Sequence, residues 1–125
     1  MLLVILQNAY RETGKYKDRD EWMERMWCSH TGRRLKEMLP DIEVYVENAN
    51  PKLGRESNSI FPPDISHLKN VIKVTKPKVI LACGKVAQEG LDELGVDYIP
   101  APHPAWRQLS KKDTSRIRKK IASIV

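Results

Sequence analysis

The sequence predicts an α/β protein with three layers, in which a central four-stranded parallel sheet lies between helices (the αβα arrangement). Short continuous apolar runs, typical of strands buried on both faces, alternate with segments whose apolar residues recur at helical spacing. Prolines, glycines and polar capping residues separate most of these segments. A chain of 125 residues can bury one hydrophobic core, so we expect a single domain over residues 1–125.

Four apolar runs supply the expected strands. The second run is rich in β-branched and aromatic side chains, the third follows Pro77, and the fourth leads into a proline-rich loop. The strands are expected at residues 2–6, 42–46, 78–82 and 96–99. Because strands and helices alternate, the strands should run parallel and be joined by right-handed crossovers. By contrast, residues 10–21 are polar and highly charged, and we expect a loop there.

Capping residues delimit four expected helices. Thr31 is a possible N-cap of a helix over 30–39, which a proline ends, and Asp64 caps the second helix. Gly95 suits the C-cap of the third helix. A serine at 110 with an acid three residues later resembles a capping box for the last helix. That helix is expected to bury Ile117, Ile121, Ile124 and Val125.

Positive charge is concentrated in one segment. Residues 107–120 contain seven basic residues and one acidic residue, and this segment accounts for the whole net charge of +6. A basic segment of this kind is typical of a surface that contacts a polyanion such as nucleic acid. The alternative is a solvated helix face.

The sequence also argues against several other classes of protein. The first apolar run is too short for a signal peptide or a membrane span, so we expect a cytoplasmic protein without membrane contact. Cys28 and Cys83 lack CxxC spacing and are expected to be reduced. Cys28 and His30 form a C-x-H pair without a second pair, so we expect no metal. Dinucleotide, phosphate-loop and serine-hydrolase motifs are missing, and we expect no cofactor.

Polar residues follow all four expected strands. In open parallel sheets, ligands bind beyond the carboxyl ends of the strands, so these residues should converge on a site. They are Gln7, Asn8, Tyr10, Asn48, Asn50, Gly84, Lys85 and His103. Pro102 and Pro104 restrict the backbone on both sides of His103, and a rigidly held imidazole suits the stabilisation of developing negative charge. Carboxamides and aromatic rings suit the recognition of a nucleobase.

Five segments carry short motifs in chain order. They are LQNAYR (6–11), RMWCSHTGRRL (25–35), YVEN (45–48), PKVILACGKVA (77–87) and HPAWR (103–107). Together they resemble the uracil-DNA glycosylase superfamily, whose corresponding motifs read GQDPYH, RPFVGRAGQLL in the iron–sulfur branch, YITN, PxVIVALGxxA and HPSPL or HPSPR. The resemblance covers nearly the whole chain and implies the same αβα fold. Because only two cysteines are present, we expect no iron–sulfur cluster.

The resemblance implies a pocket for a base flipped out of DNA. Asn48 would read the Watson–Crick edge of uracil, and Trp27 would stack on its face. Gln7 would line the pocket, while Tyr10 would stand near C5 and exclude the methyl group of thymine. For each residue a purely structural role, such as ending a strand or filling the core, is the alternative.

The resemblance also implies two catalytic residues. Asn8 would position the attacking water, and His103 would stabilise negative charge on the uracil O2. Asn8 stands where one branch has Asp, and an Asn cannot act as a general base, so water attack would depend on positioning. Leu6 and Ala9 replace the Gly and Pro of that motif, a change that bears on where the water is held.

DNA contacts are expected after the histidine. Arg107 falls at the position of the side chain that fills the gap left by the flipped base, and Lys111 and Lys112 begin the basic segment. Ala105 and Trp106 replace Ser and Pro of the motif, which removes a hydroxyl and adds a ring that could stack on a base.

The sequence therefore predicts a monomeric, cofactor-free DNA glycosylase that hydrolyses the N-glycosidic bond of uracil and leaves an abasic site. Three alternatives stay open. The first is a glycosylase for another damaged or modified base, and the second is a catalytically impaired member that only binds DNA. The third is an unrelated α/β enzyme that acts on a small phosphate compound at Gly84 and Lys85.

Overall fold

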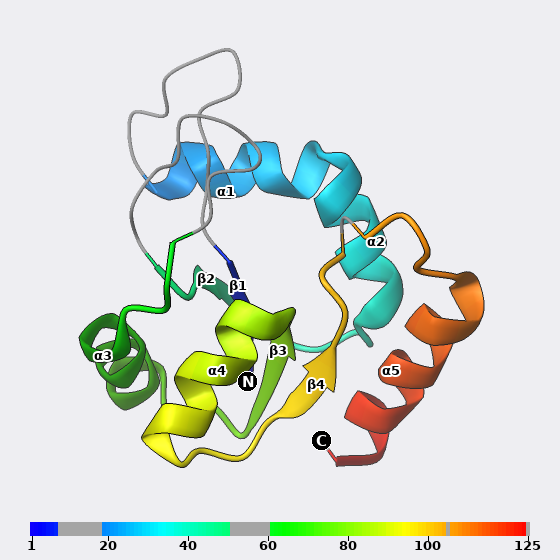
Figure 1. Cartoon of the computed structure of the whole chain (residues 1–125). Helices are drawn as coiled ribbons and strands as arrows, with labels where there is room; N and C mark the ends of the chain where they lie inside the picture. The colour runs from blue at the N-terminus through cyan, green and yellow to red at the C-terminus, as the bar shows by residue number, and fades with distance from the viewer. Residues whose placement is uncertain (8–18, 51–60, 105, 125) are drawn as a thin grey trace.

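The structure is a computed structural model that describes residues 1–7, 19–50, 61–104 and 106–124. It contains one four-stranded parallel sheet with the strand order β2-β1-β3-β4 (Figure 1). The strands are β1 (Leu2–Leu6), β2 (Val44–Asn48), β3 (Val79–Cys83) and β4 (Ile99–Ala101). The helices are α1 (Arg19–Cys28), α2 (His30–Met38), α3 (Ile65–Thr75), α4 (Lys85–Leu94) and α5 (Lys111–Ile124). This confirms the predicted fold class.

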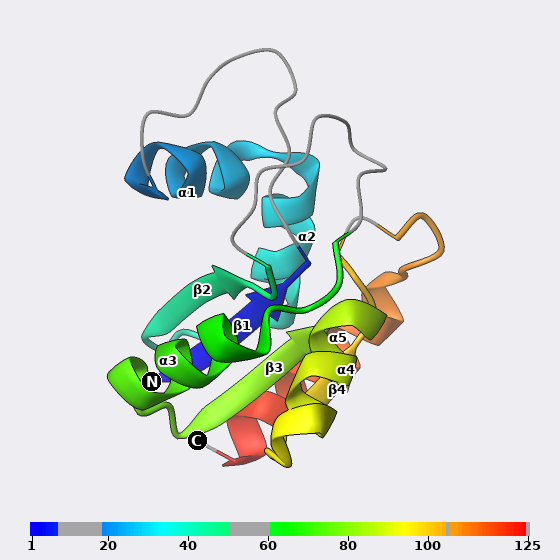
Figure 2. The same ribbon diagram turned by 60° about the vertical axis from the view of Figure 1, so that its left-hand side comes forward.

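Helices cover both faces of the sheet. Alternate residues of β1 enter two separate apolar clusters, because successive side chains of a strand point to opposite faces. Leu2, Val4 and Leu6 pack with buried residues of α1, α2 and α5, whereas Leu3 and Ile5 pack with those of α3 and α4. Figure 2 shows α3 and α4 on one side of the sheet and α2 and α5 on the other.

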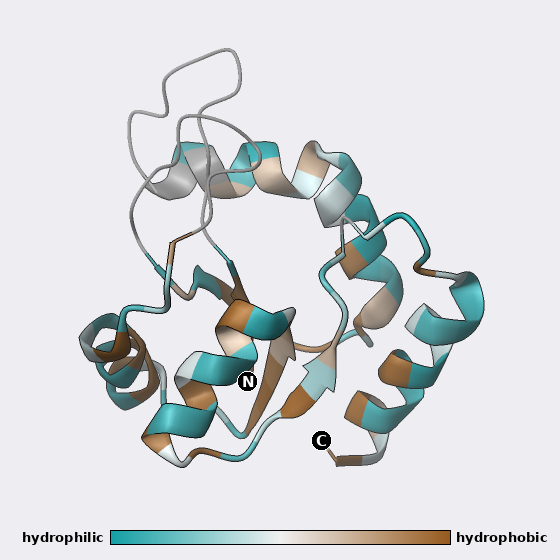
Figure 3. Cartoon of the chain, viewed as in Figure 1, coloured by the Kyte–Doolittle hydropathy of each residue, from teal (hydrophilic) through white to brown (hydrophobic). Residues whose placement is uncertain are grey.

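The strand order explains this division of the helices. The chain moves from β1 outward to β2, then returns across β1 to β3 and continues to β4. With right-handed crossovers, this reversal of direction moves the connecting helices from one face to the other. Strands β1 and β3 are accordingly apolar on both faces, and the outward sides of α4 and α5 are hydrophilic (Figure 3).

Three of the predicted caps are confirmed. Asp64 Oδ1 accepts the His67 N–H at 3.0 Å and starts α3. Gly95 ends α4 with a φ of +68°, in the left-handed region that suits glycine. Ser110 and Asp113 form the reciprocal capping box: Ser110 Oγ accepts the Asp113 N–H at 3.2 Å, and Asp113 Oδ2 accepts the Ser110 N–H at 3.1 Å.

The first half of the chain departs from the sequence prediction in two places. Residues 19–21, expected in a loop, begin α1. This helix has little apolar periodicity of its own and is stabilised by packing, with Met26 buried and Trp27 partly buried against the core. The N-cap of α2 is Ser29 and not Thr31, because Ser29 Oγ accepts the Gly32 N–H at 3.2 Å and Thr31 already lies inside the helix.

Three strands are shifted toward their carboxyl ends relative to the prediction, β3 by one residue and β2 and β4 by two or more. Strand β2 begins at Val44, so Asn48 is its last residue. Strand β4 comprises residues 99–101 and not 96–99, because Ile99 and Ala101 lie opposite Leu81 and Cys83 of β3. Pro100 is tolerated because β4 is an edge strand.

The end of α5 also differs from the prediction. Ile117 and Ile121 are buried as expected, but Ile124 is 47% exposed, because it lies in the last turn. Val125 lies outside the described residues. In the part of the chain that the structure describes, every helix is too short or too polar to cross a membrane.

Candidate functional site

The carboxyl ends of the four strands lie at one edge of the sheet and bring the predicted polar residues to it. Strands β1 and β3 are neighbours, yet the chain leaves β1 toward one face and β3 toward the other. In open α/β sheets, ligands bind beyond the strand ends at such a reversal. Gln7, Asn48, Gly84 and His103 end or follow the four strands at this edge.

Asn48 carries a buried polar atom that its surroundings leave unsatisfied. Its side chain lies on the same face of β2 as Val46, in the layer of α1 and α2. The residue is 6% exposed, and its Oδ1 has no hydrogen-bond partner among the described residues. A buried unpaired carboxamide oxygen costs about 1–3 kcal/mol, so it is rarely retained without a use. Asn48 thus offers an acceptor for a donor on a ligand.

The neighbouring Asn50 is buried too, but its amide is occupied. Its Nδ2 donates to the Pro62 carbonyl at 2.8 Å, which holds the segment before α3 against the strand end. The Asn50 N–H donates to the Gln7 carbonyl at 3.1 Å, one step beyond the last β1–β2 pair. This bond fixes the backbone of the half-buried Gln7 beside the residues that follow β2.

His103 is held on a braced arm at the other side of the sheet. The Gly84 N–H donates to the Ala101 carbonyl at 2.8 Å, and Gln88 Nε2 donates to the carbonyls of Ala82 and Ala101 at 3.3 and 3.2 Å. The ends of β3 and β4 are thereby tied together just below the histidine. The role of Gln88 was not predicted from the sequence. The signal that could have indicated it is a glutamine one turn after the glycine that begins a helix.

His103 lies beside the position that a side chain at Gly84 would occupy. A Cβ added at Gly84 would stand 3.6 Å from His103 Cβ and 3.9 Å from Cδ2. Gly84 has a φ of +92°, a conformation that other residues rarely adopt. Burial lowers the pKa of His103 below its usual value of 6.5, because a charged ring loses hydration there. The ring is therefore neutral at pH 7 and can donate one hydrogen bond.

The segment after His103 forms turns that lead to the basic helix. The Trp106 N–H donates to the His103 carbonyl at 2.9 Å, and the buried Leu109 closes the next turn. Arg34 of α2 donates to the Leu109 carbonyl, so the turn is anchored to the body of the domain. Trp106 is 46% exposed. The exposed cations of this region are Arg107, Lys111, Lys112, Arg116, Arg118, Lys119 and Lys120.

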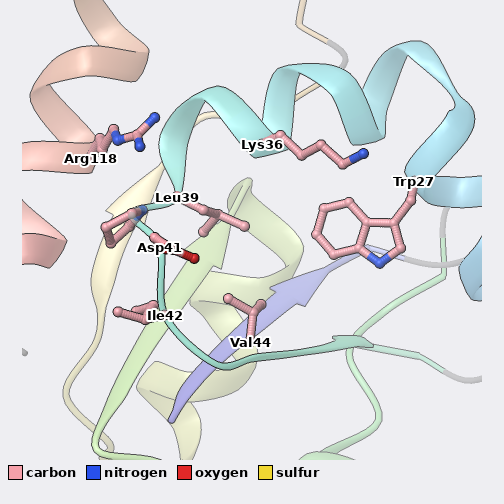
Figure 4. A pocket seen from close by; sticks show the side chains of 8 residues that line it. Trp27, Lys36, Leu39, Asp41, Ile42, Val44 and Arg118 are labelled. Atoms are coloured by element: carbon pink, nitrogen blue, oxygen red, sulfur yellow. The ribbon is translucent and has the colours of Figure 1, made fainter.

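Trp27 lies at one end of a hollow of about 520 Å³ beside α2 and β2. Lys36 Nζ stands 5.6 Å from the centre of the indole ring, and Val44 lies on the β2 side (Figure 4). Arg118 of α5 lines the opposite end. Leu39, Pro40, Asp41 and Ile42 complete the lining. These contacts put Trp27 in the same layer as Asn48 and do not join it to His103.

The remaining predicted groups are placed as follows. Asn8 and Tyr10 lie outside the described residues, as do Ala9 and Ala105. Leu6 is a core residue, 3% exposed. Among the described residues, His, Cys, Asp and Glu form no group of three that could hold a metal ion. Cys28 and Cys83 are free thiols, and burial raises the pKa of Cys83 to about 12.

The fold is of the doubly wound α/β class, in which ligands bind beyond the carboxyl edge of the sheet. The profile of the uracil DNA glycosylase superfamily matches residues 7–123 of the chain. The chain belongs to this superfamily. Membership supports a DNA glycosylase-type function in DNA repair and implies DNA as the substrate. The comparisons with curated proteins and with solved structures gave no match.

Proposed function

We propose that this protein excises uracil from DNA and leaves an abasic site. The observation that carries the proposal is the buried, unpaired Oδ1 of Asn48. Uracil presents an N3–H donor between two carbonyl oxygens, whereas cytosine presents an acceptor at N3. An unsatisfied acceptor placed opposite N3 therefore favours uracil, because N3 of cytosine carries no proton to donate to it.

His103 supplies stabilisation of the leaving base. As the glycosidic bond breaks, its electron pair passes to the base and negative charge gathers on uracil O2. A neutral imidazole that donates a hydrogen bond to O2 stabilises this charge without the cost of burying a cation. The braced arm of β4 supports this role, since the donor is in place before the charge develops.

The other pocket residues have positioning roles in the proposal. Asn8 orients the water whose oxygen bonds to the sugar C1′, and the proton that this water loses passes through solvent to the uracil anion. Gln7 lines the pocket. Tyr10 excludes a methyl group at C5. Trp27 provides a stacking surface in the layer that also contains Asn48. No metal or cofactor takes part in these steps.

The proposal assigns the exposed segment after His103 to the DNA. Flipping a base costs a few kcal/mol, so a side chain must fill the gap in the stack and cations must hold the phosphates. Arg107 fills that gap, and Lys111 and Lys112 contact phosphates, all three being exposed. The exposed ring of Trp106 stacks on a neighbouring base.

The test is strand cleavage by alkali after incubation with oligonucleotides that contain one uracil, single-stranded and paired with G or A. Uracil-dependent cleavage is expected, and Asn48→Ala or His103→Ala should lower its rate by roughly 100-fold or more. Lys69→Ala, an exposed change on α3, is the control and should retain the wild-type rate. Absence of cleavage on every uracil substrate would overturn the proposal.

A panel of other bases separates the alternatives. Release of a deaminated purine or a C5-modified pyrimidine, but not of uracil, would indicate a different substrate base. DNA binding without release of any base would indicate a catalytically impaired member. If Tyr10 limits access at C5, Tyr10→Ala should release thymine from a G·T mismatch.

A further inference from the structure

We propose that Glu47 is a positioning residue for Asn48 and acts together with His67; this inference rests on the proposed function. Glu47 is the residue before Asn48 in β2, but its side chain lies on the opposite face of the sheet, toward α3. The side chain is only 12% exposed. A carboxylate buried this far needs a structural or functional reason.

The backbone N–H of Asn48 points to the open edge of the sheet. Strand β2 is an edge strand, and the Ala49 N–H donates to the Leu6 carbonyl of β1 at 2.9 Å. Because successive N–H groups of a strand alternate in direction, the Asn48 N–H faces away from β1. Glu47 Oε1 accepts this N–H at 3.1 Å, a bond that the sheet itself cannot supply.

His67 of α3 holds the carboxylate from the other side. Its Nε2 is buried, lies 3.7 Å from Glu47 Oε1, and has no hydrogen-bond partner in the part of the chain that the structure describes. The backbone of His67 is fixed as well, because its N–H donates to the capping Asp64 Oδ1 at 3.0 Å. The position of the ring is thus set by the start of α3.

These contacts close into a ring around the backbone of Asn48. The Asp64 N–H donates to the Ala49 carbonyl at 2.8 Å, so the same cap that holds His67 also holds the residue after Asn48. The ring runs from Asn48 through Glu47, His67 and Asp64 to Ala49. It ties Asn48 to α3 on the face opposite its carboxamide, and leaves the carboxamide clear of these contacts.

The ring accounts for how Asn48 can be kept rigid at an open edge. Edge strands and strand ends are the places where a sheet frays most easily. A base-reading amide must be held within a fraction of an ångström, and a misplacement of about 1 Å can lower a rate by about 100-fold. Glu47 supplies this restraint without touching the base.

The first test measures single-turnover uracil release and DNA affinity. Glu47→Ala should lower the rate constant by roughly 10- to 100-fold and leave the DNA dissociation constant nearly unchanged. Glu47→Gln should recover most of the rate, because its amide oxygen can still accept the Asn48 N–H. The rate constant of His67→Ala should lie between those of Glu47→Ala and Glu47→Gln. The matched control is Glu43→Ala, an exposed carboxylate just before the same strand. A wild-type rate in Glu47→Ala would overturn the inference.

A double-mutant cycle separates positioning from general support of the fold. In an Asn48→Ala background, Glu47→Ala should cause little further loss, because the group that it positions is gone. Equal losses in both backgrounds would overturn the inference. Circular dichroism and thermal unfolding identify variants that fail to fold. If Glu47→Ala fails to fold, the rates of Glu47→Gln and His67→Ala still decide the test.

Amide hydrogen exchange tests the ring independently of base release. The Asn48 N–H should exchange faster in Glu47→Ala than in wild type, whereas exchange of the Ala49 N–H should change less. Unchanged exchange at Asn48 would show that Glu47 does not hold this N–H. If the wild-type protein releases no uracil, the proposed function fails, and the exchange result alone decides whether the ring exists.

Discussion

A Cβ added at Gly84 would stand 3.6 Å from His103 Cβ, so the glycine that follows β3 and the histidine that follows β4 are close neighbours at the carboxyl edge of the sheet. The φ of +92° and ψ of +169° at Gly84 lie in a region that is essentially confined to glycine. The same turn donates the Gly84 N–H to Ala101, two residues before the histidine. The conformation of one residue therefore sets the position of the other.

Gly84→Ala should both destabilise the protein and slow base release. The strained backbone costs about 1–3 kcal/mol, or relaxes by shifting the turn under His103, which should lower the rate by roughly 100-fold. Gly95→Ala is the control, because Gly95 also has a positive φ but no atom within 4 Å of an added Cβ. It should cost about 1–2 kcal/mol and leave the rate unchanged. Equal rate losses in Gly84→Ala and Gly95→Ala would contradict the conclusion that the Gly84 turn positions His103.

The partly buried His103 should make stability depend on pH. Burial lowers its pKa in the folded state, so the unfolded chain takes up a proton more readily. Its contribution to stability is complete above the unfolded pKa of about 6.5 and is lost as the pH falls through the lower folded pKa. Urea unfolding should therefore show that the free energy of unfolding falls more between pH 7.5 and pH 5 for wild type than for His103→Gln. His30→Gln, at an exposed position, should behave as wild type does. A pH dependence that His103→Gln leaves unaltered would contradict this reading.

Gly32→Ala should destabilise the corner between α1 and α2. On an exposed helix the change would stabilise by about 1 kcal/mol. Here an added Cβ would overlap the Met26 carbonyl oxygen and stand 2.6 Å from Trp27 Cα. Both are backbone atoms that cannot rotate away, so overpacking should prevail and cost about 3 kcal/mol. Thermal unfolding of this variant and of Arg33→Ala, at an exposed position of the same helix, measures the difference. A melting temperature equal to that of the control would rule out the clash.

The sequence predicts most of the fold because its signals are local. The buried strands β1 and β3 are continuous apolar runs, and Asp64, Gly95 and the Ser110 capping box act within one helical turn. Parallel topology then gathers the strand ends, which explains why Asn48 and His103 could be proposed together.

The features that were missed depend on contacts between distant residues. Helix α1 begins with three charged residues that continue the polar segment before it, and it is stabilised by the packing of Met26 and Trp27 on the core. The bounds of β4 follow from its pairing with β3, not from its own apolar run. The contact between Glu47 and His67 joins residues 20 positions apart through the packing of α3 on β2, and no sequence spacing indicates it. Local patterns cannot report such contacts.

Neutralising Lys111 and Lys112 together should weaken DNA binding in a salt-dependent way. Both are exposed at the start of α5, where the proposed function has them bind phosphates. Removing one phosphate-binding cation should reduce the slope of log K against log salt by about 0.9 for duplex DNA and about 0.7 for single strands. DNA titrations at about 50 to 200 mM salt measure this slope. For the double alanine variant on duplex DNA, the slope should be smaller than that of wild type by up to about 1.8. Lys69→Ala with Lys73→Ala, two cations on α3 across the sheet, should leave the slope unchanged. Equal slopes for the two double variants would place the DNA elsewhere than along the segment after His103.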